Sequence, residues 1–342
     1  MEAYKRLEVE FAEWNQLPAE GMVVCSSGTA ALHLALESIR LPKGSQVICP
    51  DFTMVACARA ITMADLVPLF VDCGEDLLMN PELRVRDITY PNHALMVVHI
   101  YGRKCDVKGL RGIVGTASNI IVVEDLAEAH GVKPHPQTDA ACWSFFKNKI
   151  IAGEEGGAVW FINPEHAELA RQLRNIGFTD DHDFNHIPRG CNYRMSNANA
   201  EPILASLDRW RIRVHDGINP VWDRRRIESW YDIYCPSEWK MPPRVCPWVY
   251  DFRIKGMTGD KQNRIVKELN ASGIAARHAF KPMSKQEEYR ECKLVTGQKG
   301  MVEPPNSWML SQEVIYLLIS PGVITQRDAR RSFEIIQRVV GS

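Results

Sequence analysis

The stretch that decides the fold is MVVCSSGTAALHLALESI, residues 22–39. Its first four residues form an apolar run typical of a buried strand, and apolar side chains recur at helical spacing from residue 30 to residue 39. The turn LPKG at residues 41–44 ends this predicted helix. A strand followed directly by a helix is the unit from which α/β folds are built, so the stretch predicts an α/β fold.

The same alternation continues along the chain to about residue 162. Strands that are apolar on both faces, with helical stretches between them, predict a mostly parallel sheet covered by helices on both sides. The further strand-like runs lie at residues 46–49, 67–71, 95–98, 120–123 and 158–162.

Beyond residue 162 the pattern changes. Helical stretches dominate at residues 164–174 and 198–231, and a connection rich in Pro, Cys and Trp follows at residues 235–247. We therefore predict a large domain formed by residues 1–220 and a small C-terminal αβ domain formed by residues 221–342. In the small domain we expect strands at residues 248–254 and 314–319 and helices at residues 261–272 and 327–340.

The composition excludes several classes of function. The chain has 342 residues, and its 41 Lys and Arg against 42 Asp and Glu create no net field that would attract nucleic acid or a membrane surface. No run approaches the roughly 18 apolar residues of a spanning helix, and the charged N-terminal segment does not resemble a signal peptide. The ten cysteines are scattered without a C-x-x-C pair. We expect a reduced, cytoplasmic protein without a metal site.

A candidate anion site follows the first strand. Ser27, Gly28 and Thr29 open the first helix, where a glycine lets backbone N–H groups approach a ligand and the helix N-terminus favours negative charge. The alternative is an ordinary helix N-cap, which uses the same residue types.

A pair of acidic residues ends the strand in VVEDLAEAHG, residues 122–131. Glu124 and Asp125 are expected at the carboxyl edge of the sheet, where open α/β folds bind ligands. A buried carboxylate there needs a cationic partner, and a protonated pyridine nitrogen would serve. The alternative for Asp125 is a helix-capping role.

Two lysines lie in the turn of WSFFKNK, residues 143–149, before the glycine turn GEEGG at residues 153–157. A lysine held at the end of an apolar strand is partly desolvated, which favours the neutral, nucleophilic amine. Such an amine can form a Schiff base with a carbonyl or with pyridoxal phosphate (PLP). The alternative is two solvated lysines in a hairpin loop.

Together, and in this order, these segments resemble the DegT/DnrJ/EryC1/StrS family of PLP-dependent sugar aminotransferases. The S-F-F-x-N-K and E-A-H-G forms are most like those of the perosamine-synthase branch. The motifs that carry the resemblance are S-G-T-A-A-L at residues 27–32, P-x-x-T at 50–53, F-V-D at 70–72, H-x-Y-G at 99–102, V-E-D-x-A-E-A-H-G at 123–131, S-F-F-x-N-K at 144–149 and G-x-N-Y-R-M at 190–195.

The resemblance implies the aspartate-aminotransferase-like fold, type I of the PLP-dependent transferases, and a role for each matched residue. Lys149 matches the Schiff-base lysine, whereas Lys147 has no counterpart. Asp125 matches the carboxylate that keeps the pyridine nitrogen protonated, and Glu128 lies where the family has a residue beside the ring hydroxyl. The resemblance assigns Ser27, Gly28, Thr29 and Ser144 to the phosphate, Met54 to the face of the ring, and Asn192 to a phosphate contact from the other subunit of a homodimer with shared active sites.

The activity implied is transfer of an amino group from glutamate to a nucleotide-linked 4-keto-6-deoxy sugar. Two departures from the family pattern keep another acceptor open, such as a keto-cyclitol or another ketone. Met54 stands where the family commonly has an aromatic residue, and the chain begins at the helix before the phosphate segment, without the family's N-terminal arm. A third interpretation is a regulatory homologue that binds PLP without turnover.

Overall fold

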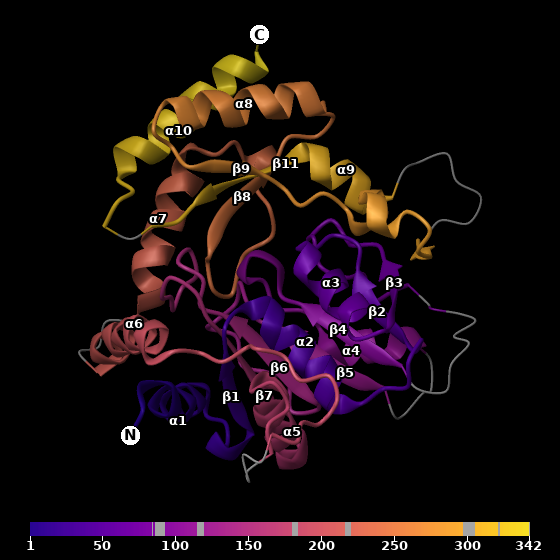
Figure 1. Ribbon diagram of the computed structural model, residues 1–342. Coiled ribbons are helices and arrows are strands. Elements are labelled where there is room, and N and C mark those ends of the chain that lie inside the picture. Colours follow the sequence, from indigo (N-terminus) through magenta and orange to yellow (C-terminus); the bar gives the residue numbers. More distant parts are fainter. Residues whose placement is uncertain are drawn as a thin grey trace.

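The computed structural model describes residues 1–83, 85, 93–114, 120–179, 184–215, 220–296, 305–320 and 322–341. Figure 1 shows two parts, a lower one built around a large sheet and an upper one in which helices α8 and α10 cover a smaller sheet. The N-terminus lies in the lower part and the C-terminus at the top of the upper part. No helix among the described residues is long and apolar enough to cross a membrane.

The large sheet has eight strands in the order β1-β7-β6-β5-β4-β2-β3-β10 among the described residues. All neighbouring pairs are parallel except the two that β7 makes, with β1 and with β6. The mostly parallel sheet expected from the sequence is therefore confirmed. Its strands are β1 Met22–Cys25, β2 Gln46–Pro50, β3 Val67–Val71, β4 Ala94–Val98, β5 Ile121–Asp125, β6 Ala140–Ser144, β7 Gly157–Phe161 and β10 Leu294–Val295.

Helices cover both faces of this sheet because its strands are apolar on both sides. In β1, Val23 and Cys25 pack into the core on one face, whereas Met22 and Val24 pack into the core on the other. The first face is covered by α2 (Gly28–Ile39), α3 (Val55–Met63) and α5 (Pro164–Arg174), and the second by α1 (Ala3–Asn15), α4 (Val107–Arg111) and α6 (Asn197–His215).

The small sheet is antiparallel, in the order β8-β11-β9, with α7, α8 and α10 packed on it. The last helix begins with a capping box, in which Thr325 and Asp328 satisfy each other's backbone N–H groups. The helices and strands of this C-terminal part are α7 Pro220–Tyr234, β8 Val249–Arg253, α8 Gly259–Ala271, β9 Ala276–His278, α9 Asn306–Glu313, β11 Val314–Leu318 and α10 Gln326–Val340.

Short 3₁₀ turns occur in both parts of the chain. They are η1 Ala19–Gly21, η2 Ile100–Gly102, η3 Gly112–Val114, η4 Ser237–Trp239, η5 Met283–Lys285 and η6 Glu287–Tyr289.

The helical stretch expected at residues 198–231 forms two helices, α6 and α7, and residues 216–219 between them lie outside the described residues. The predicted domain boundary at residues 220/221 falls beside this gap and stays a prediction. One short strand crosses that division, because β10 pairs with β3 of the large sheet.

Two aspartates at the carboxyl edge of the large sheet fasten the C-terminal region onto it. Asp51 accepts hydrogen bonds from the hydroxyls of Ser284 (2.9 Å) and Ser307 (2.6 Å). Asp72 accepts the backbone N–H groups of Asn306 (2.9 Å) and Ser307 (2.8 Å), at the start of α9. The carboxylate that follows β3 thus binds the N-terminus of a helix more than two hundred residues later in the chain, which fastens that helix to the large sheet.

Candidate active site

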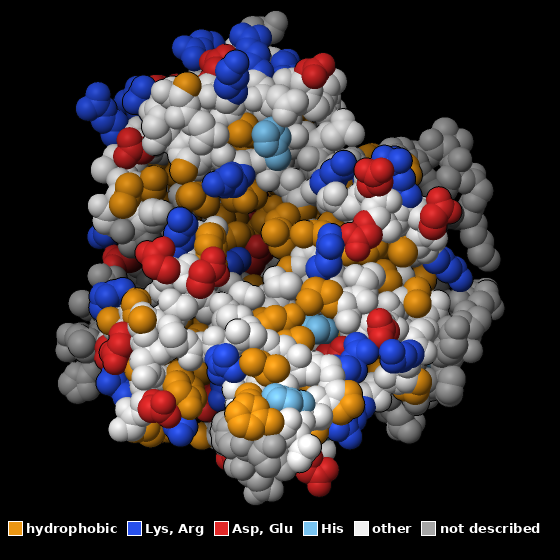
Figure 2. Space-filling model, in the orientation of Figure 1, with side chains coloured by type: hydrophobic (Ala, Val, Ile, Leu, Met, Phe, Trp, Pro, Cys, Tyr) orange, Lys and Arg blue, Asp and Glu red, His pale blue; other side chains and the backbone are white. Residues whose placement is uncertain are grey.

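A cavity of about 340 Å³ lies at the carboxyl edge of the large sheet, a size typical of small-molecule sites. Figure 2 shows a hollow between the part that carries β8 and the part that carries α2, with hydrophobic side chains gathered around it. The loops that follow parallel strands converge at this edge, so distant segments of sequence meet here. Eight of the nine residues predicted for the site line the cavity, namely Ser27, Gly28, Thr29, Met54, Asp125, Glu128, Ser144 and Lys149.

The N-terminus of α2 opens into this cavity. Ser27 is the N-cap residue, and its hydroxyl accepts the Ala30 N–H (3.1 Å). Gly28 lies directly against Ser144 at the end of β6, where a Cβ on residue 28 would come within 2.7 Å of the Ser144 Cβ. Only glycine lets the helix begin this close to the strand. The first turn of a helix carries unpaired N–H groups and partial positive charge, so this is a place where an anion can bind.

Asp125 is a buried carboxylate at the end of β5. Its Oδ1 accepts the Ala127 N–H (2.9 Å) and its Oδ2 accepts the Cys57 thiol (3.2 Å). Burial raises the pKa of the Cys57 thiol well above its usual range, and the charge of Asp125 adds to this effect, so Cys57 acts as a neutral donor. Within the described ranges no lysine or arginine forms an ion pair with Asp125. A buried carboxylate without a cation fits the protonated ring nitrogen of PLP.

Glu128 lies three residues further on and faces the catalytic lysine predicted from the sequence. Its Oε1 is 3.7 Å from Lys149 Nζ, and its Oε2 accepts the Tyr101 N–H (3.0 Å). Tyr101 has a left-handed backbone (φ 54°), a conformation that costs energy for a residue other than glycine and that here directs its N–H at the carboxylate. Burial raises the pKa of Glu128 to about 7, with Asp125 adding to the rise and Lys149 and the Tyr101 N–H opposing it.

The turn after β6 separates the two lysines of the S-F-F-x-N-K motif. It is closed by a hydrogen bond from the Lys149 N–H to the Phe146 carbonyl (2.8 Å). The side chain of Lys149 is only 12% exposed and lines the cavity. Lys147 is exposed, with its Nζ 5.7 Å from the centre of the Phe146 ring. Of the two lysines, Lys149 alone is therefore placed to act on a ligand in the cavity.

His130 holds this turn through two hydrogen bonds to its backbone. Its Nε2 donates to the Ser144 carbonyl (2.9 Å), and its Nδ1 accepts the Ile151 N–H (3.1 Å). This pattern requires the neutral imidazole, and burial lowers the pKa of His130 to about 3, with the charge of Lys149 adding to the effect. The motif histidine therefore holds both ends of the lysine turn and is a structural residue.

Two predicted residues lie toward the outside. Met54 is the N-cap residue of α3 and is 51% exposed, so it lies at the open side of the cavity. Asn192 is exposed on the loop before α6 and does not line the cavity. Its neighbour Tyr193 accepts the Ser26 N–H through its carbonyl (2.8 Å), which places this loop beside the turn between β1 and α2. The role expected for Asn192 in a partner's site stays a prediction.

Three residues of the site gave no signal in the sequence. Cys57 reaches Asp125 from α3, and Trp248 and Tyr316 complete the cavity from the small sheet. Trp248 immediately precedes β8 and Tyr316 lies on β11, and both strands were predicted at nearly these positions. The sequence alone did not show that this sheet faces the lysine turn, because the contact joins residues about one hundred and more positions apart.

Replacing Glu128 by Gln should change how stability depends on pH in the cofactor-free protein. The carboxyl's pKa rises from an ordinary 4.5 to about 7 on folding, so its contribution is full below pH 4.5 and is lost as the pH rises through 7. The free energy of unfolding of the wild type, measured with urea, should fall relative to Glu128→Gln by roughly 3 kcal/mol between about pH 4.5 and pH 8. The exposed Glu154→Gln variant is the control, and parallel curves for Glu128→Gln and wild type would contradict the prediction.

Comparison with known proteins identifies the family. Residues 2–337 match the model of the DegT/DnrJ/EryC1/StrS aminotransferase family. The chain is 31% identical over 276 residues to a GDP-perosamine synthase of Caulobacter vibrioides, an alignment that covers 76% of this chain and 72% of that protein. It is 35% identical over 210 residues to a GDP-perosamine synthase of Vibrio cholerae, covering 60% of this chain and 56% of that protein.

A solved structure described as a sugar aminotransferase from Streptococcus pneumoniae, in its PLP form, superposes with a TM-score of 0.83 at 23% identity and covers 98% of this chain and 92% of that one. The likeness confirms the predicted fold. The family match, which extends over nearly the whole chain, confirms the predicted family. The chain belongs to the DegT/DnrJ/EryC1/StrS aminotransferase family.

Proposed function

We propose that this aminotransferase uses PLP to transfer an amino group from glutamate to a nucleotide-linked 4-keto-6-deoxy sugar. The observation that carries the proposal is the meeting of three features in one cavity. They are a buried carboxylate that pairs with no lysine or arginine of the described residues (Asp125), a partly buried lysine (Lys149) and the N-terminus of α2. The GDP-perosamine synthases of Caulobacter vibrioides and Vibrio cholerae support the sugar acceptor, because they are similar over most of the chain.

The residues present fit the cofactor. The N–H groups of Gly28 and Thr29 begin α2 and, with Ser27 and Ser144, would hold a phosphate. Asp125 would pair with the ring nitrogen, Glu128 would lie beside the ring oxygen, and Met54 would pack against the ring from the open side. When bound, the cofactor supplies an aldehyde that accepts the amine and a ring that withdraws electrons once its nitrogen is protonated.

The chain's own residues then have distinct tasks. Lys149 Nζ would supply the nucleophilic amine that holds the cofactor, and as a free amine the same nitrogen would move a proton to or from the reacting carbon of the substrate. Such general acid–base help is worth about 10²–10⁴-fold. Asp125, held by Ala127 and Cys57, would keep the ring nitrogen protonated. Glu128 Oε1 lies 3.7 Å from Lys149 Nζ, and because burial raises the pKa of Glu128 to about 7, this carboxyl can hold or release a proton near neutral pH.

The proposal includes a homodimer with shared active sites in the cytoplasm. Asn192 is exposed on the loop beside the β1–α2 turn and would enter the cavity of a second copy from there. This placement supports a contact that one protomer makes for its partner.

The acceptor is tested by a half-reaction screen. The holo-protein is first converted with glutamate, which should bleach its visible absorbance, and NDP-4-keto-6-deoxy sugars, a keto-cyclitol and pyruvate are then added singly. We expect the absorbance to return only with a nucleotide-linked keto sugar. Return with the keto-cyclitol alone would replace the proposed acceptor, and a protein that glutamate does not bleach would be a PLP-binding regulator.

Lys149→Ala should remove the visible absorbance of the covalently held cofactor and abolish turnover, because the nucleophilic amine is lost. Lys147→Ala is the matched control, since this lysine lies two residues away on the exposed side of the same turn, and it should leave both properties largely intact. Absorbance spectra of the purified holo-proteins and the glutamate half-reaction measure the two effects. A Lys149→Ala protein that keeps the wild-type spectrum would refute the assignment.

Shared sites predict complementation between inactive variants. Lys149→Ala and a disruptive Asn192→Arg variant should each be inactive, and unfolding and refolding them together should restore activity to about one quarter of wild type, since half of the dimers are mixed and each has one intact site. If Asn192 serves its own protomer, the mixture stays inactive. Each variant refolded alone is the control.

A further inference from the structure

Trp248 is the side chain through which the small sheet contacts the lysine turn. It immediately precedes β8 and is only 5% exposed. Its indole N–H donates to the Asn148 carbonyl (2.8 Å), and Lys149 Nζ lies 4.1 Å from the centre of its ring. One side chain from the C-terminal half of the chain therefore contacts two consecutive residues of the turn, the first with its polar edge and the second with its ring face.

The backbone just before Trp248 is fastened to the large-sheet part at Gly102. The Gly102 carbonyl accepts the N–H groups of Val245 (2.9 Å) and Cys246 (3.0 Å). Gly102 has a positive φ of 82°, and a Cβ there would overlap the Cys246 carbonyl oxygen at 1.7 Å. The close approach of these two backbone segments therefore depends on glycine at this position. It fixes residues 245 and 246 against the turn η2, which also carries Tyr101.

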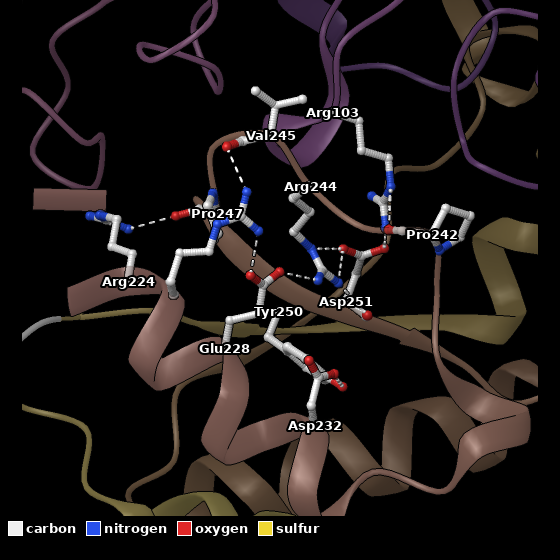
Figure 3. A network of polar contacts seen from close by, with 11 residues as sticks. Arg103, Arg224, Glu228, Asp232, Pro242, Arg244, Val245, Pro247, Tyr250 and Asp251 are labelled. Carbon is white, nitrogen blue, oxygen red and sulfur yellow. Dashed lines mark hydrogen bonds and ion pairs between the residues drawn. The ribbon is translucent and has the colours of Figure 1, made fainter. Parts of the chain in front are cut away.

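A buried network of charges holds the same segment from the other side, and Figure 3 shows it. Asp251 on β8 accepts hydrogen bonds from Arg103 Nη2 (2.8 Å) and from Arg244 Nε (2.8 Å). Arg244 Nη1 also donates to Glu228 on α7 (2.8 Å), whose other oxygen accepts Arg225 Nη1 (2.8 Å). Because Arg103 follows η2 and Asp251 lies on β8, this network ties the two parts together.

Arginines of α7 also bind the backbone just before the tryptophan and the carbonyl of the tryptophan itself. Arg225 Nη2 donates to the Val245 carbonyl (2.9 Å), and the buried Arg224 donates to the carbonyls of Pro247 (3.4 Å) and Trp248 (3.2 Å). Hydrogen bonds to charged donors are stronger than neutral ones, so the segment from residue 244 to residue 248 has little freedom. The position of the indole is therefore set by the packing between the two parts.

We propose that Trp248 is a positioning residue for Lys149, with its N–H fixing the turn and its ring face holding the amine toward Glu128 and favouring the ammonium form. The face of an indole attracts a cation, most strongly where water is excluded. The inference concerns Lys149 as the reactive amine and in that respect rests on the proposed function. The other titratable groups near Lys149 are Glu128, Asp125, Glu155 and Tyr316, which line the same cavity, and the neutral His130, which the charge of Lys149 reaches. None of them is changed in a Trp248 variant.

The test is competitive labelling of the cofactor-free protein with trace acetic anhydride across a pH series, followed by mass spectrometry of the peptides that carry residues 147 and 149. The unprotonated amine attacks the anhydride carbonyl, acetate leaves and a proton passes to the buffer, so labelling follows the neutral amine. In Trp248→Leu, half-maximal labelling of Lys149 should move to lower pH by about one unit, because the ammonium form loses its aromatic contact. The pH of half-maximal labelling of the exposed Lys147 should not change.

Trp160→Leu is the matched control. Trp160 is also buried and its indole N–H also donates to a backbone carbonyl, that of Pro18 (3.1 Å), but it does not line the cavity. A folded Trp248→Leu protein whose Lys149 labels as in wild type would overturn the proposal. If Trp248→Leu does not fold, the same labelling is done on protein grown with fluorinated tryptophan. Fluorine weakens the attraction of the ring face for a cation and leaves the indole N–H in place. A lower pH of half-maximal labelling at Lys149 supports the proposal, and an unchanged pH overturns it.

The labelling needs no cofactor, substrate or turnover, so its outcome is separate from that of the half-reaction screen. A protein that fails the screen and still shows the shift would have a different acceptor and the same lysine positioning. A protein that passes the screen without the shift would be the proposed enzyme with a tryptophan that only fills space.

Discussion

The carboxylate of Asp125, buried at the end of β5 without a cation among the described residues, is the constraint on which the site depends. Burying an isolated carboxylate costs several kcal/mol in ordinary protein surroundings, and two neutral donors, the Ala127 N–H and the Cys57 thiol, do not replace a positive charge. The fold keeps this charge at the one edge of the sheet where a ligand can reach it. The cationic ring nitrogen of PLP would complete the arrangement, and the same cavity also has a helix end suited to an anion and a lysine.

The large sheet places these groups together by topology. Asp125 ends β5, Ser144 ends β6, and the turn that follows β6 carries Lys149, so adjacent strands deliver the carboxylate and the amine to neighbouring positions. The antiparallel β7 then lets β1 return beside it, which brings the start of α2 to the same edge. Gly28 is required because the helix begins against the Ser144 side chain.

The small sheet contributes the remaining wall of the cavity. Its position is fixed by carboxylates of the large sheet that bind the start of α9 and by the buried network around Asp251. Buried ion pairs of this kind contribute little net stability because desolvation offsets their attraction, but they hold a defined geometry. Here that geometry sets where Trp248 lies relative to Lys149.

Local sequence patterns were enough to predict most of the helices and strands, and the motifs were enough to predict the main residues of the site. Apolar runs and helical spacing depend on neighbouring residues, so β1, β3 and α5 were predicted at their observed bounds, and the motifs identified Asp125, Glu128 and Lys149. Three-dimensional packing was needed to show that Lys149 is partly buried whereas Lys147, two residues away, is exposed. It was also needed to show that Cys57 supports Asp125 and that Trp248 covers Lys149. These contacts join residues that are far apart in the chain, and their existence depends on how sheets and helices pack, which no local pattern records.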